Sequence, residues 1–143
     1  MALVIGPLYV RRALYIEEQP TRIWQKFEAR SALNLWYGKG HSIDAFVQGA
    51  DGYVELSVDI DNVRARFGGP TVCWQPASEW SYQNNWLDEH CPWAWPLPTF
   101  TTFRLTALYS GTLVELLHHG FERLGADAAE QLQAYENGWD ARH

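Results

Sequence analysis

The chain is poor in cysteine, in positive charge and in long apolar runs. Its two cysteines, Cys73 and Cys91, are too few for a disulfide framework, so we expect free thiols in a reducing cytoplasm. Its 11 Lys and Arg against 17 Asp and Glu give a net charge of -6, which argues against a surface for nucleic acid or anionic membrane. No window approaches the roughly 18 apolar residues of a membrane-spanning helix, and no signal-peptide pattern opens the chain. The sequence therefore predicts a cytoplasmic protein that binds neither nucleic acid nor membrane.

Aromatic side chains, in contrast, are abundant. Eight Trp, seven Tyr and six Phe make up 15% of the chain, while 20% of the residues are charged. A chain of 143 residues can bury roughly two thirds of its unfolded surface around one core. Because no internal repeat, low-complexity tract or linker interrupts it, we predict a single domain spanning residues 1–143.

The first forty residues predict one strand followed by two short helices. Residues 8–17 have the composition of a strand. A helix is expected over 19–30, where Pro20 suits the first helical position because its missing N–H would have no intrahelical partner. A second helix is expected over 31–38, with Ser31 as its N-cap.

From residue 42 the pattern changes from helical spacing to alternation of apolar and polar residues, which is typical of strands. Gly, Pro, Asp and Asn mark the junctions between them. The order indicates an antiparallel meander. The predicted strands are 42–48, 52–60, 63–67 with a second piece at 71–75, 79–89, and a hairpin over 99–121 that turns at Ser110 and Gly111.

The last predicted element is a helix over 127–142. Asp127 and Glu130 resemble a capping box, and Tyr135 and Trp139 lie on its apolar face. The resulting order predicts an α+β fold, in which a curved antiparallel sheet wraps around this long C-terminal helix. A helix about 10 Å wide cannot fill the whole concave face, so we expect a gap between them.

Two runs near the C-terminus, GTLVELLHHGFERLG and QAYENGWDAR, resemble a known superfamily. They are similar to the helix-grip fold of the START and birch-pollen-allergen superfamily, in its activator of heat-shock-protein-90 ATPase homologue-like branch. The resemblance implies a helix-grip fold over nearly the whole chain. It also implies a function like those of its members, which include ligand-binding domains, polyketide cyclase-like proteins and co-chaperone segments. The residues that carry it are Thr112, His118, Gly120, Phe121, Tyr135, Gly138 and Trp139, with support from Trp36 and Gly52.

One stretch departs from the family pattern. Where such proteins commonly carry Thr-Trp-x-Trp, this chain has Gln83, Asn84, Asn85 and Trp86, so Asn84 replaces a Trp that faces the cavity. The departure predicts a roomier and wetter pocket. An unpaired buried amide costs about 1 to 3 kcal/mol, so water, a protein partner or a ligand must satisfy Asn84.

Two consecutive histidines end the last predicted strand. Side chains alternate between the faces of a strand, and Glu115 marks one face as solvent-exposed. His118 is therefore expected to point inward and His119 outward, so the pair cannot easily chelate one metal ion. For His118 three roles stay open, namely a buried hydrogen-bonded side chain, a group that orients a ligand, or a catalytic group.

The same alternation predicts a ligand site. Apolar walls with a few polar groups are typical of pockets for small molecules, although these side chains could also fill the gap as ordinary core. We expect a small hydrophobic or aromatic molecule or a lipid as ligand, without a metal, a cofactor or an assigned catalytic residue. The predicted lining is Trp80, Tyr82, Asn84, Trp86, Phe103, Leu105, Val114, Leu116 and His118, closed by Tyr135 and Trp139.

Two other classes of function stay open. In the first, the protein is a cyclase-like or hydrolase-like enzyme in which His118 is the general acid or base and Tyr82 or Asn84 polarises a carbonyl. In the second, it is an interaction domain, either co-chaperone-like or a homodimer formed through Trp93 and Trp95 in the proline-rich loop over 90–98.

Overall fold

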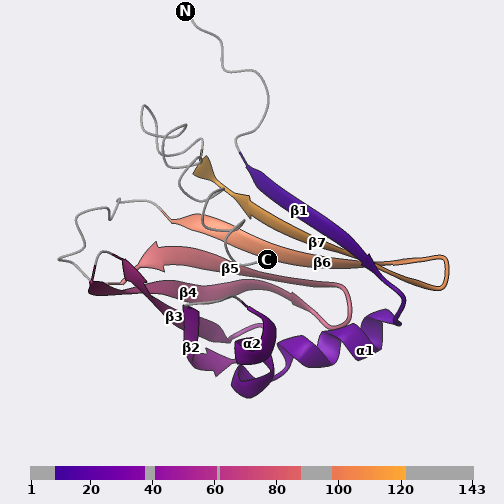
Figure 1. Ribbon diagram of the computed structural model, residues 1–143, viewed down its shortest axis with the longest axis horizontal. Helices are drawn as coiled ribbons and strands as arrows, with labels where there is room; N and C mark the ends of the chain where they lie inside the picture. Colours follow the sequence, from indigo (N-terminus) through magenta and orange to yellow (C-terminus); the bar gives the residue numbers. More distant parts are fainter. Residues whose placement is uncertain (1–8, 38–40, 61, 88–97, 122–143) are drawn as a thin grey trace, which may run out of the picture.

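The computed structural model describes residues 9–37, 41–60, 62–87 and 98–121. They form a curved, seven-stranded antiparallel sheet in the order β1-β7-β6-β5-β4-β3-β2 (Figure 1). This confirms the predicted antiparallel sheet of an α+β fold. The strands are β1 Val10–Ile16, β2 His41–Val47, β3 Tyr53–Ile60, β4 Val63–Gln75, β5 Glu79–Trp86, β6 Thr99–Leu108 and β7 Gly111–His119.

Several expectations lie outside the described residues. These are the C-terminal helix over 127–142, with Tyr135 and Trp139, and the Trp93 and Trp95 part of the loop over 90–98. Within the described part of the chain, the helices are too short to cross a membrane.

The helical connection between β1 and β2 comprises α1 Pro20–Trp24, a 3-10 turn η1 Gln25–Phe27 and α2 Arg30–Trp36. Pro20 occupies the predicted first helical position. The helix expected over 19–30 is instead broken into α1 and η1, and Glu28 N–H bonds to the Gln25 carbonyl three residues back.

The expectation that Ser31 caps the second helix is wrong. Ala29 is the N-cap, with the extended dihedrals φ -149° and ψ 151°, and α2 already includes Ser31. The chain enters α2 early because Ala29 supplies the extended conformation, and its carbonyl accepts the first helical bond from Leu33 N–H.

Strand β4 is continuous where two pieces were predicted. Gly68 has φ +131°, and a Cβ atom there would collide with the Val54 carbonyl oxygen. Glycine therefore keeps β4 in register with β3, from Gly68 opposite Glu55 to Pro70 opposite Tyr53. The irregularity lies further on and faces β5, between Thr71 and Cys73.

The core lies between the helical connection and one face of the sheet, which we call the inner face and which carries Trp80 and Phe103. Figure 1 shows α1 and α2 together on one side of the strands. The Phe27 ring, from η1, has its centroid 5.3 Å from that of Phe103 and 6.2 Å from that of Trp80. Aromatic packing from the first helices therefore anchors the middle of the inner face.

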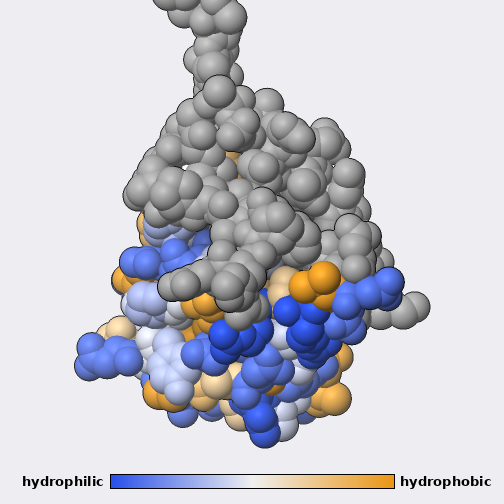
Figure 2. Space-filling model, turned by 90° about the vertical axis from the view of Figure 1, so that its left-hand side faces the viewer, coloured by the Kyte–Doolittle hydropathy of each residue, from blue (hydrophilic) through white to orange (hydrophobic). Residues whose placement is uncertain are grey.

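The surface turned to the viewer in Figure 2 mixes hydrophilic and scattered apolar residues over its described part. Single exposed apolar side chains are normal on globular proteins and carry no function by themselves. The candidate site is therefore found among buried groups.

Candidate functional site

Four polar side chains meet on the inner face, and we call them the inner polar cluster: Asn84, Thr99, Thr101 and His118. They come from the end of β5, the start of β6 and the end of β7, where Asn84 is opposite Thr99 and Thr101 is opposite His118. Asn84 has an exposed fraction of 3%, and the other three have 0%. Antiparallel pairing therefore places residues that are distant in sequence in one buried group.

Hydrogen bonds connect the cluster but leave one atom over. Thr99 Oγ1 lies 2.7 Å from His118 Nε2, and Asn84 Nδ2 donates to Thr101 Oγ1 over 3.3 Å. Asn84 Nδ2 also lies 3.4 Å from His118 Nε2. Asn84 Oδ1 is buried and accepts no hydrogen bond from the described part of the protein. Such a buried acceptor is uncommon and calls for an explanation.

Phe121 covers the His118 side of the cluster. The rings have their centroids 4.8 Å apart, and Phe121 is fully buried. The sequence HHGF produces this contact because Gly120 has φ +95°, a conformation that glycine adopts at little cost and that turns the chain at the end of β7. A Cβ atom on Gly120 would lie 3.1 Å from the Phe100 ring, so the turn is also closely packed.

Tyr82 lies on the inner face, but its hydroxyl points to the helical connection. The hydroxyls of Tyr37 and Tyr82 are 2.5 Å apart, and both side chains are buried. Trp80, two residues earlier on β5, donates its Nε1–H to Thr71 Oγ1 over 3.2 Å. Tyr82 thus separates an aromatic region around Trp80 from the inner polar cluster.

The predicted lining residues divide between these two regions. Trp80 and Phe103 stack at 5.7 Å and contact the ring of Phe27, so they are part of the aromatic core. Leu105 and Leu116 are buried in the same core, and Val114 and Trp86 are half-buried against it. Only Asn84 and His118 among the predicted residues belong to the inner polar cluster.

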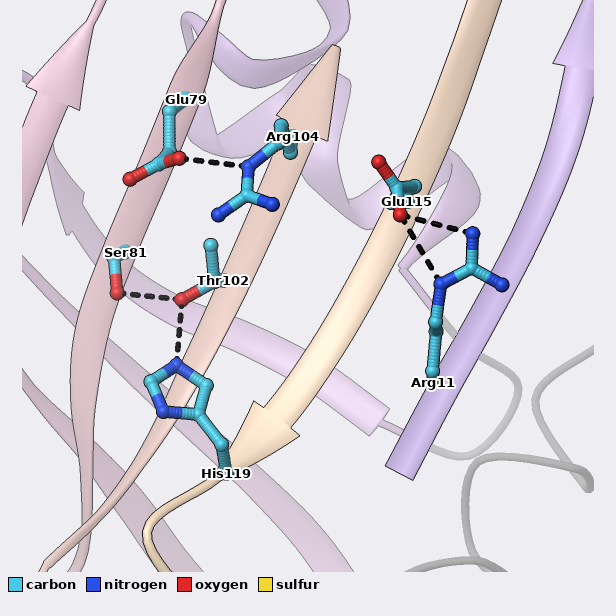
Figure 3. Close-up of polar contacts among 7 residues, drawn as sticks. All are labelled: Arg11, Glu79, Ser81, Thr102, Arg104, Glu115 and His119. Atoms are coloured by element: carbon cyan, nitrogen blue, oxygen red, sulfur yellow. Dashed lines mark hydrogen bonds and ion pairs between the residues drawn. The ribbon is translucent and has the colours of Figure 1, made fainter. Parts of the chain in front are cut away.

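His119 lies on the opposite, outer face, as the alternation predicted. Its Nε2 is 2.9 Å from Thr102 Oγ1, which is 2.8 Å from Ser81 Oγ (Figure 3). The same face carries two ion pairs, Arg104 with Glu79 at 3.0 Å and Arg11 with Glu115 at 2.9 Å. Within the described residues, no three His, Cys, Asp or Glu side chains are grouped so that they could hold a metal ion.

Two ionisable side chains on the outer face, Glu79 and Cys73, have shifted pKa values. Partial burial acts to raise the pKa of Glu79, but hydrogen bonds from Arg104 and from the Cys73 thiol, with the charge of Arg104, outweigh it and hold that pKa below its usual value. Burial, and then the hydrogen bond to Glu79, raise the pKa of the Cys73 thiol. A thiol with a raised pKa is a poor nucleophile at neutral pH.

The contacts of His118 bear on its three possible roles. Its Nε2 already contacts Thr99 and Asn84, whereas a general base needs a ring nitrogen facing the substrate. These contacts make His118 a member of a hydrogen-bonded group with Thr99 and Asn84.

Sequence reasoning missed three side chains of this region: Thr99, Thr101 and Tyr37. The two threonines could have been found, because the alternation that placed Phe103 inward extends back to Thr101 and Thr99. No local pattern indicates that Tyr37, at the end of α2, reaches Tyr82.

No protein-family model and no curated protein matches this sequence. Solved structures do match in fold. A protein of Arthrobacter aurescens is 15% identical with a TM-score of 0.73, over 94% of this chain and 81% of that one. A protein encoded in the dynemicin biosynthetic locus is 14% identical with a TM-score of 0.66, over 96% of this chain but 45% of that one.

A third structure is the Aha1 dimer from Colwellia psychrerythraea. It is 16% identical with a TM-score of 0.56, over 89% of this chain and 87% of that one. At such identities the comparison concerns the backbone and carries no activity with it. The chain therefore shares the fold of these proteins, which is consistent with a helix-grip arrangement.

Proposed function

We propose that this protein binds a small hydrophobic or aromatic molecule on the inner face of its sheet, beside the inner polar cluster. The observation that carries the proposal is Asn84 Oδ1, a buried acceptor that no described group satisfies. Small-molecule sites combine apolar walls with a few convergent polar groups, and the surroundings of Asn84 have this composition.

The aromatic core supports the proposal by giving the site a fixed wall. Tyr82, two residues from Asn84 on the same face, is held by the contact of its hydroxyl with that of Tyr37 and by the Trp80 ring at 5.0 Å. A wall held in this way loses little conformational entropy when a ligand binds. Tyr135 and Trp139 are proposed to close the site from the C-terminal helix, and the protein is proposed to act in the cytoplasm.

A panel of flavonoid-like and lipid-like compounds tests the proposal, with intrinsic Trp fluorescence and calorimetry as readouts. We expect saturable binding of at least one compound class with one site per chain. A broad panel without any saturable change would count decisively against a receptor.

A variant locates the site. Asn84→Trp places the family's aromatic residue at the cluster, and we expect it to abolish binding because the new ring occupies the ligand's position. The matched control is Asn85→Trp, which changes the same residue type at the next position, on the opposite face of β5. Equal binding by both variants would place the ligand elsewhere.

A further inference from the structure

We propose that the ligand carries an uncharged hydrogen-bond donor on an aromatic ring, such as a phenolic hydroxyl, and that Asn84 Oδ1 accepts this donor. This inference rests on the proposed function and specifies the chemical class of the ligand. It follows from the hydrogen bonds, the charges and the aromatic neighbours of the inner polar cluster.

The hydrogen bonds of the cluster indicate whether the ligand donates or accepts a hydrogen bond at Asn84. Asn84 Nδ2 is directed at Thr101 Oγ1 and His118 Nε2, so the donor side of the amide already faces protein. His118 Nε2 and Thr99 Oγ1 engage each other at 2.7 Å. The capacity left over is an acceptor, Oδ1, and an acceptor without a partner selects a ligand that donates.

The composition of the cluster disfavours an acidic head group at this position. The inner polar cluster consists of Asn, Thr and His side chains and contains no Lys or Arg. The edge strand β1 carries a cationic side chain, Arg12, on the inner face. Arg12 lies opposite Leu116, not opposite a member of the cluster, and its Nη1 donates to the Arg11 carbonyl over 2.8 Å. A carboxylate or phosphate beside Oδ1 would place a negative charge against a carbonyl dipole in a site removed from water.

Two aromatic side chains lie near the cluster in the fold, Tyr82 on β5 and Phe121 just after β7. Tyr82 precedes Asn84 by two residues on β5, a spacing of about 7 Å along a strand. Phe121 and His118, at 4.8 Å from each other, lie at the end of β7. A flat aromatic ring with a donor at its edge suits an acceptor whose hydrogen-bonded neighbour His118 itself packs on an aromatic ring.

Four naphthalene derivatives test the inference on the wild-type protein by calorimetry at neutral pH. They are 2-naphthol, which donates a hydrogen bond, naphthalene and 2-methoxynaphthalene, which donate none, and 2-naphthoate, which is an anion. We expect 2-naphthol to bind about tenfold more tightly than either neutral compound without a donor. We expect 2-naphthoate to bind more weakly than all three.

The variant Asn84→Leu keeps the branched shape and removes the acceptor, so the preference for 2-naphthol should disappear. Asn85→Leu, on the outer face, should retain it. Equal affinity of the wild type for the neutral compounds would overturn this inference and leave the proposed function standing. Absence of saturable binding by all four would also overturn this inference, whereas the proposed function is decided separately by the broad panel of flavonoid-like and lipid-like compounds. The wild-type comparison decides the inference even if Asn84→Leu fails to fold.

Discussion

Replacing Asn84 by Leu should not destabilise the free protein, although most buried substitutions do. The amide leaves Oδ1 buried without a hydrogen bond, which costs about 1–3 kcal/mol. Its donor contacts, at 3.3 and 3.4 Å, are long, but losing them leaves the fully buried Thr101 Oγ1 without its hydrogen bond, which costs about 1–3 kcal/mol and offsets the gain from removing Oδ1. Leu adds buried apolar surface at a position with an exposed fraction of 3%. We expect the free energy of unfolding to rise by at most about 1 kcal/mol, or the Tm by up to roughly 3 °C.

Urea unfolding followed by Trp fluorescence measures this change, with Asn85→Leu as the matched control. A shift of the midpoint at constant m-value reports stability alone. If Asn84→Leu instead loses more than about 1 kcal/mol, the amide oxygen is satisfied in the free protein and the reasoning is refuted. A gain in stability with loss of ligand preference would mean that the amide is kept for binding at a cost in stability.

Three further changes test the fold and its ionisable groups. Phe27→Ala should lower the free energy of unfolding by about 3–5 kcal/mol, because this ring is 3% exposed and packs on Phe103 in the core; a loss under about 1 kcal/mol in urea would contradict that packing. Gly68→Ala should lower the Tm more than Gly49→Ala, since both glycines have positive φ but only Gly68 faces a backbone oxygen; equal thermal shifts would show that β4 can move aside. The folded-state pKa of Glu79 is lowered, so its contribution to folding stability is present above pH 4.5 and is lost as the pH falls through the lowered pKa. Glu79→Gln should reduce this loss of stability at acid pH by less than about 1 kcal/mol in unfolding measurements, and an unchanged pH dependence would contradict the pairing with Arg104.

The faces of the strands could be predicted from the sequence. His118 lies inward and His119 outward because successive side chains alternate in a strand, whatever the rest of the fold does. The position of Pro20 at the start of α1 also follows from local geometry, because a residue without an N–H loses no intrahelical hydrogen bond there. Both features depend on geometry within a few consecutive residues.

The limits of local patterns are visible at β4 and α2. Gly68, Gly69 and Pro70 read as a break, but the strand continues because β3 supplies a carbonyl that only glycine can approach. Ser31 looked like a cap, but the N-cap is Ala29, two residues earlier. In both places the sequence marked a position where the backbone changes, but the contacts with neighbouring residues decided which conformation the chain adopts there.

By itself, the sequence determined the alternation of faces, the abundance of aromatic residues and the presence of a lone amide on the inner side of β5. The tertiary structure decided that Thr99, Thr101 and His118 surround that amide, and that Phe27 packs on Phe103. The reason is physical: a period of two fixes the side of a strand on which a residue lies, whereas its partners depend on the register between strands that are far apart in the chain. Only that register leaves Asn84 Oδ1 buried and open to a donor.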